Sequence, residues 1–381
     1  MLAKTMFGLE DILAEELRKL GASGVQTGRR SVSFQGDLGF MYKANLCLRT
    51  AIKILKPIGS FPVFSEDDLY NKIKRIRWED YMKSDGRLAV DATVHSQQFT
   101  HSKFIALKTK DAIVDRFRER SGQRPDVDLV HPTLRINVRI DRNRCTVSLD
   151  SSGGSLHKRG YKSANTIAPL NEVLAAGIVL LSGWRGQCDL LDPMCGSGTI
   201  LTEAAMIACN IPPNLNRSEF GFEHWPDFDE DLYEVIENSA LNKIRDFNYK
   251  ITGFDVDLKA LSVAKSNVKN ANLGEFIQVQ RQDFFESSKT TDAPSFIIFN
   301  PPYDERISVD TESFYKSIGD TLKQGYPGTQ AWMLCGNLEA LKSVGLRPSR
   351  KIKLFNGKLE SRLVRYEMYS GSKKAKKQAN A

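Results

Sequence analysis

Hydrophobic and polar positions follow two different patterns along this 381-residue chain. Up to about residue 165, short segments of strand-like alternation and helix-like spacing are interleaved. From residue 168 onward, helical segments separate most of a series of short apolar strands, which are expected at 188–192, 251–257, 275–283, 295–300, 329–336, 351–357 and 362–370. This alternation predicts a doubly wound, mostly parallel seven-stranded sheet of the α/β class. The last two strands have no helix between them, which predicts an antiparallel hairpin at one edge of that sheet.

The first 165 residues divide into two smaller α/β patterns. In residues 1–58, a helix at 9–22 and a strand at 31–36 precede a helix that is capped by Asp37 and gives way to a strand near Ala51. In residues 59–155, Ser65 caps a helix, and the segments that follow predict a strand at 88–96, a helix at 102–122 and a hairpin at 134–150. We expect residues 156–167 to be a linker, residues 168–370 to form the parallel-sheet domain, and residues 371–381 to be a disordered basic tail.

Charge is distributed unevenly between the two halves. Residues 1–165 hold 29 Lys and Arg against 19 Asp and Glu, whereas residues 166–370 hold 21 against 27. A basic first half favours a nucleic-acid partner, although a basic soluble surface would give the same count. The helix expected at 102–122 carries the candidate RNA-binding side chains on its polar side: Lys103, Lys108, Lys110, Arg116, Arg118 and Arg120.

Several classes of protein do not fit the sequence. No apolar run approaches the ~20 residues of a membrane-spanning helix, and the first 20 residues lack the apolar block of a signal peptide. The six cysteines include no CxxC pair and the five histidines include no HxH or HExxH, so neither a disulfide framework nor a metal site is expected. We therefore expect a cytoplasmic protein with reduced thiols, no metal and no membrane partner.

A loop with two glycines, DPMCGSGT at residues 192–199, follows the first strand of the predicted parallel sheet. Ligands of open parallel sheets bind beyond the carboxyl ends of the strands, and Gly196 and Gly198 allow the backbone to approach a ligand closely. The loop lacks the third glycine of a dinucleotide motif and the Gly-Lys-Ser/Thr of a phosphate loop. Asp192 would repel phosphates but can accept a hydrogen bond from an ammonium group, which S-adenosylmethionine carries. The candidate cofactor loop also includes Pro193 and Cys195.

Two further strands of the predicted sheet also end in aspartate. Asp255 ends the second strand, where its carboxylate can accept hydrogen bonds from ribose hydroxyls. Asp283 follows the third strand, where it can accept a hydrogen bond from an adenine amino group. A single aspartate at such a position is often only a helix cap, and we expect Asp257 to be one. Three consecutive strands that end in aspartate are a more specific pattern, which favours an adenosine-containing cofactor.

The fourth strand ends in Asn-Pro-Pro-Tyr at residues 300–303, although two prolines cannot continue a sheet ladder. An exocyclic amine on a nucleobase is a poor nucleophile, because its lone pair is delocalised into the ring. The Asn300 side-chain oxygen and the Pro301 carbonyl can accept both of its N–H bonds and turn the lone pair toward an incoming methyl group. Pro301 and Pro302 would fix the backbone, and Tyr303 would stack on a base that has left its helix.

These motifs resemble the THUMP-domain, S-adenosylmethionine-dependent RNA guanine-N2 methyltransferases, which include ribosomal large-subunit enzymes and their tRNA relatives. The resemblance covers the whole chain and rests on LHKRGY at 156–161, APLNEVLAA at 168–176, DPMCGSGTILTEAA at 192–205 and NPPYDER at 300–306. It implies a ferredoxin-like segment, a THUMP domain that binds RNA, and a class I (Rossmann-like) methyltransferase domain that makes N2-methylguanine, and we expect the substrate to be 23S rRNA.

The resemblance also implies roles for single residues. Asp192, Gly196 and Gly198 would form the cofactor loop, Asp255 would bind the ribose, Asp283 would bind the adenine, and Asn300 would lie beside the cofactor. The segment at 168–170 would close over the methionine end of the cofactor. The 63-residue gap between Asp192 and Asp255 departs from the simplest layout of such a domain, and we expect the insertion at 210–248, which fills it, to form an RNA-facing flap. Some bacterial relatives carry a second domain that makes 7-methylguanine, and we expect that activity to be missing here.

Three alternatives to this function remain open. A tRNA guanine-N2 methyltransferase would share all of these motifs. An adenine-N6 methyltransferase would also suit Asn-Pro-Pro-Tyr, because the motif can hold several exocyclic amines. An RNA-binding assembly factor with an inactive methyltransferase fold would keep the basic first half and the fold, but it would not need intact cofactor and target motifs.

Overall fold

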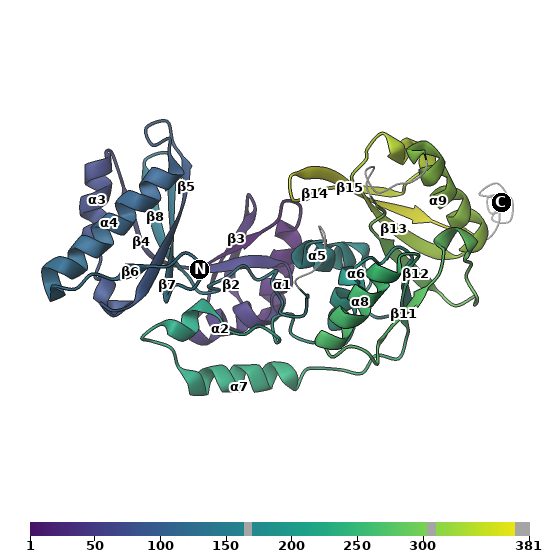
Figure 1. Cartoon of the computed structure of the whole chain (residues 1–381), viewed down its shortest axis with the longest axis horizontal. Coiled ribbons are helices and arrows are strands. Elements are labelled where there is room, and N and C mark those ends of the chain that lie inside the picture. The colour runs from purple at the N-terminus through teal and green to yellow at the C-terminus, as the bar shows by residue number, and fades with distance from the viewer. Residues whose placement is uncertain (164–169, 303–309, 370–381) are drawn as a thin grey trace. The chain divides into compact units, whose positions relative to one another are not determined.

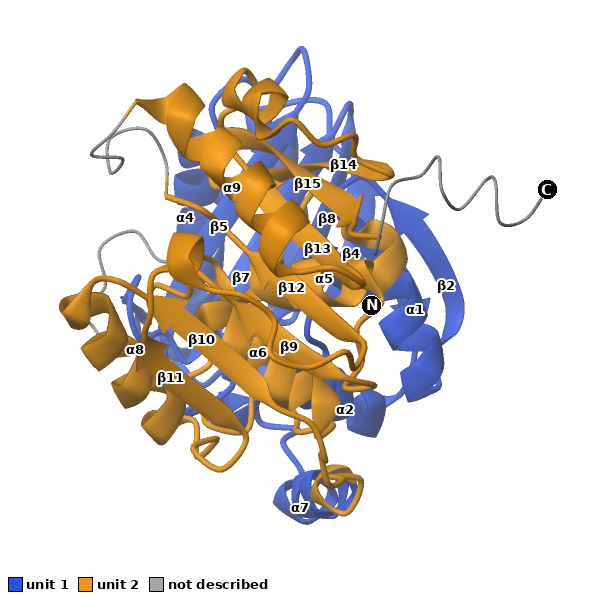
Figure 2. Ribbon diagram, turned by 90° about the vertical axis from the view of Figure 1, so that its right-hand side faces the viewer, with its two compact units in different colours: residues 1–5, 13–156, 217–239 blue, residues 6–12, 157–216, 240–381 orange. Residues whose placement is uncertain are grey.

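The computed structural model describes residues 1–163, 170–302 and 310–369. Contacts between residues divide the chain into two compact units, which Figure 2 shows in different colours. Unit 1 comprises residues 1–5, 13–156 and 217–239. Unit 2 comprises residues 6–12, 157–216 and 240–381.

A seven-stranded sheet forms the centre of unit 2, as the sequence predicts. Its strand order is β11-β10-β9-β12-β13-β15-β14. The pairs from β11 to β13 are parallel, whereas β15 is antiparallel to both β13 and β14, so the predicted edge hairpin is confirmed. The strands are β9 (Asp189–Asp192), β10 (Ile251–Asp255), β11 (Ile277–Arg281), β12 (Ser295–Phe299), β13 (Thr329–Cys335), β14 (Arg350–Asn356) and β15 (Leu359–Glu367).

Helices cover both faces of this sheet, which makes it doubly wound (Figure 1). One face carries α5 (Glu172–Ser182), α6 (Thr199–Ala208) and α8 (Leu258–Asn270), and the other carries α9 (Thr311–Gly325). Helix α5 is buried along most of its length, and the Asn171 side chain caps it by accepting hydrogen bonds from the Val173 and Leu174 N–H groups. Between β13 and β14, where the alternation of strands and helices predicts an α-helix, the chain forms a short 3₁₀ helix instead, η5 (Ala340–Val344).

Unit 1 is built on an eight-stranded sheet with the order β2-β3-β1-β4-β8-β7-β5-β6. The helix caps expected at Asp37 and Ser65 are confirmed, because their side chains accept hydrogen bonds from the N–H groups of Phe40 and Asp68. Its strands are β1 (Leu2–Thr5), β2 (Ser23–Gly28), β3 (Ser31–Gln35), β4 (Ala51–Pro62), β5 (Arg87–His95), β6 (Asp126–Val127), β7 (Leu134–Asp141) and β8 (Arg144–Asp150). The helices that begin in the first 121 residues are α1 (Glu10–Leu20), α2 (Leu38–Cys47), α3 (Glu66–Arg75), η1 (Trp78–Asp80) and α4 (Ser102–Ser121).

Strand β4 is shared by the two N-terminal segments that we expected to meet at residues 58 and 59. Its first half pairs with β1 through Ala51 to Leu55, and its remaining length pairs with β8 as far as Pro62. The register of β4 against β8 shifts between Pro57 and Gly59, so a bulge accommodates the two residues that look like strand breakers in the sequence. The ferredoxin-like and THUMP segments therefore form one continuous sheet.

The insertion at 210–248 does not behave as the expected flap. Residues 217–239 belong to unit 1, where Phe220, Phe222 and Trp225 join the hydrophobic core. The Phe222 ring stacks on Tyr42, with ring centroids 4.4 Å apart and an interplanar angle of 30°. The insertion includes the 3₁₀ helix η2 (Gly221–His224) and the helix α7 (Glu230–Leu241). Its aromatic residues therefore complete a core rather than project outward as a flap.

Two absences hold for the part of the chain that the structure describes. No helix in this part is long and apolar enough to cross a membrane. Within the same residues, no group of three or more His, Cys, Asp or Glu side chains is arranged to hold a metal ion. The six cysteines are free thiols, and five of them are buried.

We predict that Phe222→Ala destabilises unit 1 by about 3–5 kcal/mol, because it opens a cavity against Tyr42 in a closely packed core. Urea unfolding followed by near-UV circular dichroism measures the change. The control is Val235→Ala in the same insertion, because the Val235 side chain is 65% exposed and its truncation removes little buried surface. Equal midpoints for the two variants would show that the insertion is not part of the core.

Candidate active site at the carboxyl ends of β9, β10 and β12

Strand order brings the two motifs of the predicted site to the same edge of the sheet. Strand β9 lies between β10 and β12, and both pairings are parallel. In register, Asp192 lies opposite Gly253, and Leu191 lies opposite Ile297. The glycine loop follows β9 directly and Asn300 follows β12 directly. Because parallel strands share their carboxyl edge, the cofactor loop and the Asn-Pro-Pro corner lie at neighbouring strand ends.

Backbone hydrogen bonds fix the glycine loop against β10. The Cys195 N–H donates to the Phe254 carbonyl at 2.8 Å, and the Gly196 N–H donates to Asp255 Oδ2 at 2.9 Å. Gly196 and Gly198 have φ angles of +53° and +74°, which glycine adopts without strain. Among the described residues other than its two chain neighbours, no atom lies within 4 Å of the position that a Cβ atom would take at Gly196.

Gly253 is a site-forming residue that the sequence analysis missed. A Cβ atom at this position would lie 2.4 Å from Leu201 Cδ1 and 3.0 Å from Cys195 Sγ. Helix α6 and the cofactor loop can pack closely against β10 only because residue 253 has no side chain. A glycine inside a strand was the available signal, since it often marks the close approach of another backbone.

The aspartates at the strand ends combine structural and candidate binding roles. Both oxygens of Asp255 accept backbone hydrogen bonds, from the N–H groups of Gly196 and Asp257, and each keeps a further lone pair for a ligand. Asp257 caps α8 by accepting from the Lys259 N–H, which confirms its expected role. Asp283 caps the 3₁₀ helix η3 (Phe284–Glu286) by accepting from the Phe285 N–H at 2.8 Å, so its role toward adenine stays a prediction.

Asp192 is almost completely buried, with 1% of its surface exposed. Its Oδ1 accepts a hydrogen bond from the Met194 N–H at 3.2 Å. Burial, and secondarily the charge of Asp255, raises the pKa of the Asp192 carboxyl well above its usual range. A cationic group of a ligand beside this carboxyl would offset that cost, so the site has the electrostatic character that an ammonium group requires.

The Asn-Pro-Pro corner is described through Pro302. Asn300 and Pro302 are partly buried and Pro301 is buried. Phe299, the last residue of β12, is fully buried in a core cluster against which Met194 of the cofactor loop also packs. The corner and the loop thus rest on a common apolar support. Tyr303 lies outside the described residues, as do residues 168 and 169 of the expected closing segment, and both predictions remain untested.

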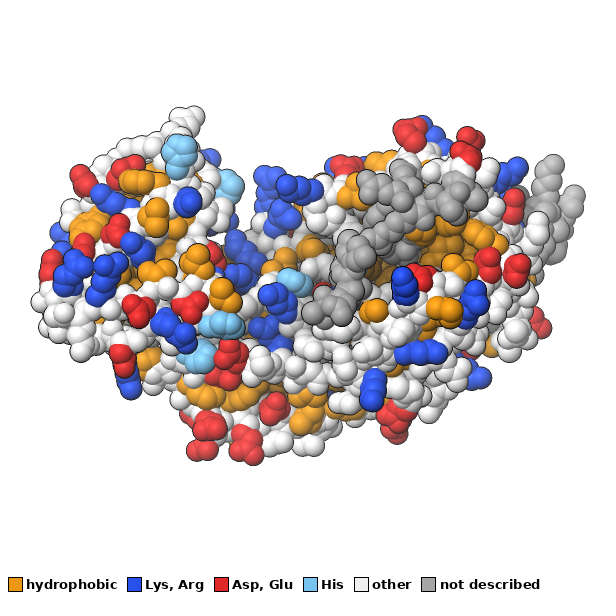
Figure 3. All heavy atoms as spheres, in the orientation of Figure 1, with side chains coloured by type: hydrophobic (Ala, Val, Ile, Leu, Met, Phe, Trp, Pro, Cys, Tyr) orange, Lys and Arg blue, Asp and Glu red, His pale blue; other side chains and the backbone are white. Residues whose placement is uncertain are grey.

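The predicted RNA-binding cations of α4 are mostly paired within unit 1. Arg116 makes two hydrogen bonds with Glu79, both at 2.8 Å, and its side chain is only 12% exposed. This pairing lowers the pKa of Glu79 to about 2. Figure 3 shows Lys and Arg side chains interspersed with Asp and Glu in this region. The other paired cations and their partners are Lys108 with Asp67, Lys110 with Asp111, Arg118 with Asp115, and Arg120 with Glu79.

Lys103 differs from the other five cations of the predicted set. It is exposed near the start of α4, and the structure records no ion pair for it with any described residue. Arg120 keeps 65% of its side chain exposed despite its pairing with Glu79. Lys103 and Arg120 are therefore the members of the set that are best placed to meet an external anion.

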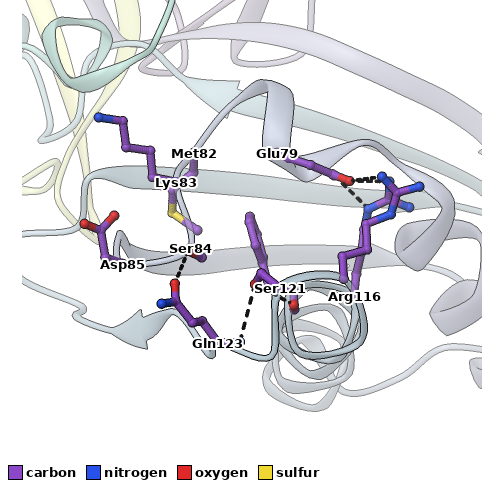
Figure 4. A pocket seen from close by; sticks show the side chains of 10 residues that line it. Glu79, Met82, Lys83, Ser84, Asp85, Arg116, Ser121 and Gln123 are labelled. Carbon is purple, nitrogen blue, oxygen red and sulfur yellow. Dashed lines mark hydrogen bonds and ion pairs between the residues drawn. The ribbon is translucent and has the colours of Figure 1, made fainter.

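A pocket of about 460 Å³ lies in unit 1 beside the second half of α4 (Figure 4). Arg116, Arg120 and Lys83 line it together with Glu79, and the buried side chains of Met82 and Phe117 contribute apolar surface. The pocket combines cationic groups, the carboxylates of Glu79 and Asp85, and apolar surface. Its position adds Lys83 to the basic residues that the sequence analysis singled out.

We predict that Asp192→Asn makes the stability of the ligand-free protein less dependent on pH. The raised pKa means that the folded state holds this proton more tightly than the unfolded state, whose carboxyl titrates near its ordinary value of about 4. The free energy of unfolding of the original protein therefore falls as the pH rises above about 4, and the variant lacks this contribution.

Urea unfolding between pH 4.5 and 8 measures this dependence. The control is Asp257→Asn, which replaces an exposed helix cap by an equally good one. The account would be contradicted if Asp192→Asn and Asp257→Asn had the same pH dependence as the original protein.

Three family models match the chain in succession. The model for the RlmL ferredoxin-like domain matches residues 1–55, the model for the THUMP domain matches residues 64–150, and the UPF0020 model, described as an RMKL-like methyltransferase domain, matches residues 159–365. Within the described residues, the first two models match the segments that form the eight-stranded sheet, and the third matches the segment that forms the seven-stranded sheet.

Two named proteins are similar to this chain over most of its length. The "Ribosomal RNA large subunit methyltransferase K/L" of Syntrophotalea carbinolica is 40% identical over 95% of this chain and 52% of its own length. The "Putative RNA methyltransferase slr0064" of Synechocystis is 40% identical over 95% of each chain. This chain thus spans about half the length of the K/L relative.

Solved structures match over nearly the full length. The structure of "SMU.472, a putative methyltransferase complexed with SAH" has a TM-score of 0.86, 30% identity and coverage of 97% of this chain and 98% of that one. A "predicted N6-adenine-specific DNA methylase" from Listeria monocytogenes has a TM-score of 0.85 and 30% identity over 96% of this chain and 95% of its own. The chain belongs to the UPF0020 family of RMKL-like methyltransferases, and it carries an RlmL ferredoxin-like domain and a THUMP domain before its class I methyltransferase domain.

Proposed function

We propose that this protein transfers a methyl group from S-adenosylmethionine to the exocyclic N2 amine of a guanine in structured RNA, with 23S rRNA as the substrate. The observation that supports this most strongly is the adjacency of two strand ends. The Asn300-Pro301-Pro302 corner follows β12, and the glycine loop follows the neighbouring parallel strand β9. An amine held at the first would face a methyl donor held at the second.

The residues of unit 2 suit S-adenosylmethionine in three respects. In the part of the chain that the structure describes, no atom beyond the two chain neighbours lies within 4 Å of where a Cβ atom at Gly196 would be, which would leave room for a ligand beside the loop. The buried carboxyl of Asp192, the last residue of β9, would favour the ammonium group of the methionine moiety. Asp255 retains acceptor capacity for the ribose hydroxyls, and Asp283 is the candidate acceptor for the adenine amine. When bound, this cofactor supplies an electrophilic methyl group on a sulfonium.

The chain's own residues would activate and orient the amine. Asn300 Oδ1 and the Pro301 carbonyl would accept the two N–H bonds, so that the nitrogen lone pair points toward the methyl group. Pro301 and Pro302 restrict the backbone torsions of the corner, which keeps both acceptors in place. Orientation of this kind supplies much of the rate of a direct transfer, and the extra proton of the methylated amine leaves to water.

An RNA substrate agrees with the THUMP domain and with the names of the relatives. The K/L relatives are named as methyltransferases of large-subunit ribosomal RNA, and the Synechocystis relative is named as an RNA methyltransferase. The name of the Listeria structure favours the second candidate, methylation of adenine N6 in nucleic acid. The two candidates share the Asn-Pro-Pro corner and differ in the base and the nucleic acid that reach it.

We predict that Asn300→Ala lowers the rate of methyl transfer by about 10²–10³-fold, because it removes one of the two acceptors that orient the amine. Binding of S-adenosylhomocysteine, measured by isothermal titration, should change by less than about threefold. The matched control is Asn356→Ala, a partly buried asparagine at the end of edge strand β14, for which transfer should be unchanged. Unchanged transfer by Asn300→Ala would refute the role assigned to Asn300.

We predict that Lys103→Ala weakens RNA binding and reduces the slope of log K against log salt concentration by about one, because one phosphate contact is lost. Filter binding with an rRNA fragment at several salt concentrations measures both quantities. The control is Lys342→Ala, since Lys342 is a lysine of unit 2 with 75% of its side chain exposed. If the two variants had the same affinity and slope, α4 would not be part of the RNA-binding surface.

A further inference from the structure

We infer that Asn267 is a positioning residue of the cofactor site. Its side chain connects the Ser197 carbonyl of the glycine loop to Ser163, in the linker that precedes α5. The inference rests on the proposed S-adenosylmethionine site, because it concerns the loop at residues 196–198. Asn267 lies on α8 and its side chain is fully buried. It is absent from every motif that the sequence analysis used.

The Asn267 amide joins two segments that are far apart in the sequence. Its Nδ2 donates a hydrogen bond to the Ser197 carbonyl at 2.9 Å. Its Oδ1 accepts from the Ser163 backbone N–H at 3.0 Å and contacts Ser163 Oγ at 3.4 Å. One buried side chain therefore satisfies a backbone acceptor of the cofactor loop and a backbone donor of the linker at the same time.

The loop needs such a restraint because of its composition. Ser197 lies between Gly196 and Gly198, the two residues with positive φ, and glycine restricts backbone torsions less than any other residue. The N–H groups on either side are held by Asp255 and by the Cys195 carbonyl. The Ser197 carbonyl and the Gly198 N–H belong to the same peptide group, so Asn267 and the Cys195 carbonyl hold this peptide from its two sides. The hydrogen bond from Asn267 thereby helps to set the direction of the N–H groups that begin α6.

The linker offers a firm support for this restraint. Arg159 is buried, and it pairs with Glu203 on α6 at 3.4 Å and with Asn214 at 3.0 Å. The Tyr161 hydroxyl reaches the same carboxylate of Glu203 at 3.2 Å. Residues 159–163 are thus attached to α6 by buried polar contacts, whose rearrangement would leave buried charges without partners.

A second asparagine of α8 provides an internal comparison. Asn270 Nδ2 donates to the Tyr161 carbonyl at 3.1 Å, so this side chain also attaches the linker to α8. No recorded contact of Asn270 reaches the glycine loop within the described residues. Substitution of Asn270 therefore removes only a contact with the linker, whereas substitution of Asn267 also removes the contact with the cofactor loop.

The test compares Asn267→Ala and Asn270→Ala in the full chain by isothermal titration with S-adenosylhomocysteine. Asn267→Ala leaves the Ser197 carbonyl and the Ser163 N–H without their partner, and we expect the Kd to rise about tenfold or more. Asn270→Ala should change the Kd by less than about twofold. In steady-state assays, Asn267→Ala should raise the KM for S-adenosylmethionine and leave the KM for RNA unchanged.

Hydrogen exchange on the unmodified protein gives a readout that does not depend on the folding of a variant. Binding of S-adenosylhomocysteine should slow exchange of the Ser163 amide together with that of Gly196, because Asn267 links the two segments. Equal Kd values for Asn267→Ala and the original protein, an equal loss in Asn270→Ala, or unchanged exchange at Ser163 would overturn the inference. Failure of the original protein to bind S-adenosylhomocysteine would instead reject the proposed function.

Discussion

The parallel pairing of β9 with β10 and β12 is the constraint on which the site depends. This pairing places the carboxyl ends of the three strands in adjacent positions. Gly253 allows the pairing to support a tightly packed loop, since any side chain there would collide with Leu201. The backbone ladder, rather than contacts between the functional side chains, therefore sets the geometry of the site.

The same edge of the sheet carries an energetic cost that is consistent with a binding role. A carboxyl as deeply buried as Asp192 is unfavourable when charged, and its neighbour Asp255 adds repulsion. Pro301 and Pro302 end β12 at the cost of ladder hydrogen bonds. Such local departures from the most stable arrangement are expected where a ligand completes the structure.

Local sequence patterns predicted the elements of the methyltransferase fold well. Short apolar strands separated by helices, side-chain caps at Asp37, Ser65 and Asp257, and the absence of a helix between β14 and β15 depend on neighbouring residues alone. The strand ends of the candidate site could be read from the sequence for the same reason. Long-range packing could not be read in this way, because it depends on residues that are distant in the chain.

Three particular residues show where local patterns failed. Pro57 resembles a strand breaker, but a bulge in β4 tolerates it and the strand continues into the THUMP segment. Phe222 lies in a polar, proline-containing insertion, yet its ring is buried against Tyr42, which precedes it by 180 residues. The role of Arg116 toward RNA stays a prediction, but its ion pair with Glu79, which leaves only 12% of the side chain exposed, could not be read from the local sequence. The partner that decides each outcome is not visible in the local sequence.

The most direct test of the central claim is the identity of the methylated nucleoside. The protein would be incubated with S-adenosylmethionine and, separately, with 23S rRNA, with tRNA and with duplex DNA that lack the modification, and the digested products would be analysed by mass spectrometry. The account predicts N2-methylguanosine in the 23S rRNA reaction and no product on DNA. N6-methyladenosine, methylation of DNA alone, or no methyl transfer to any of the three would contradict it.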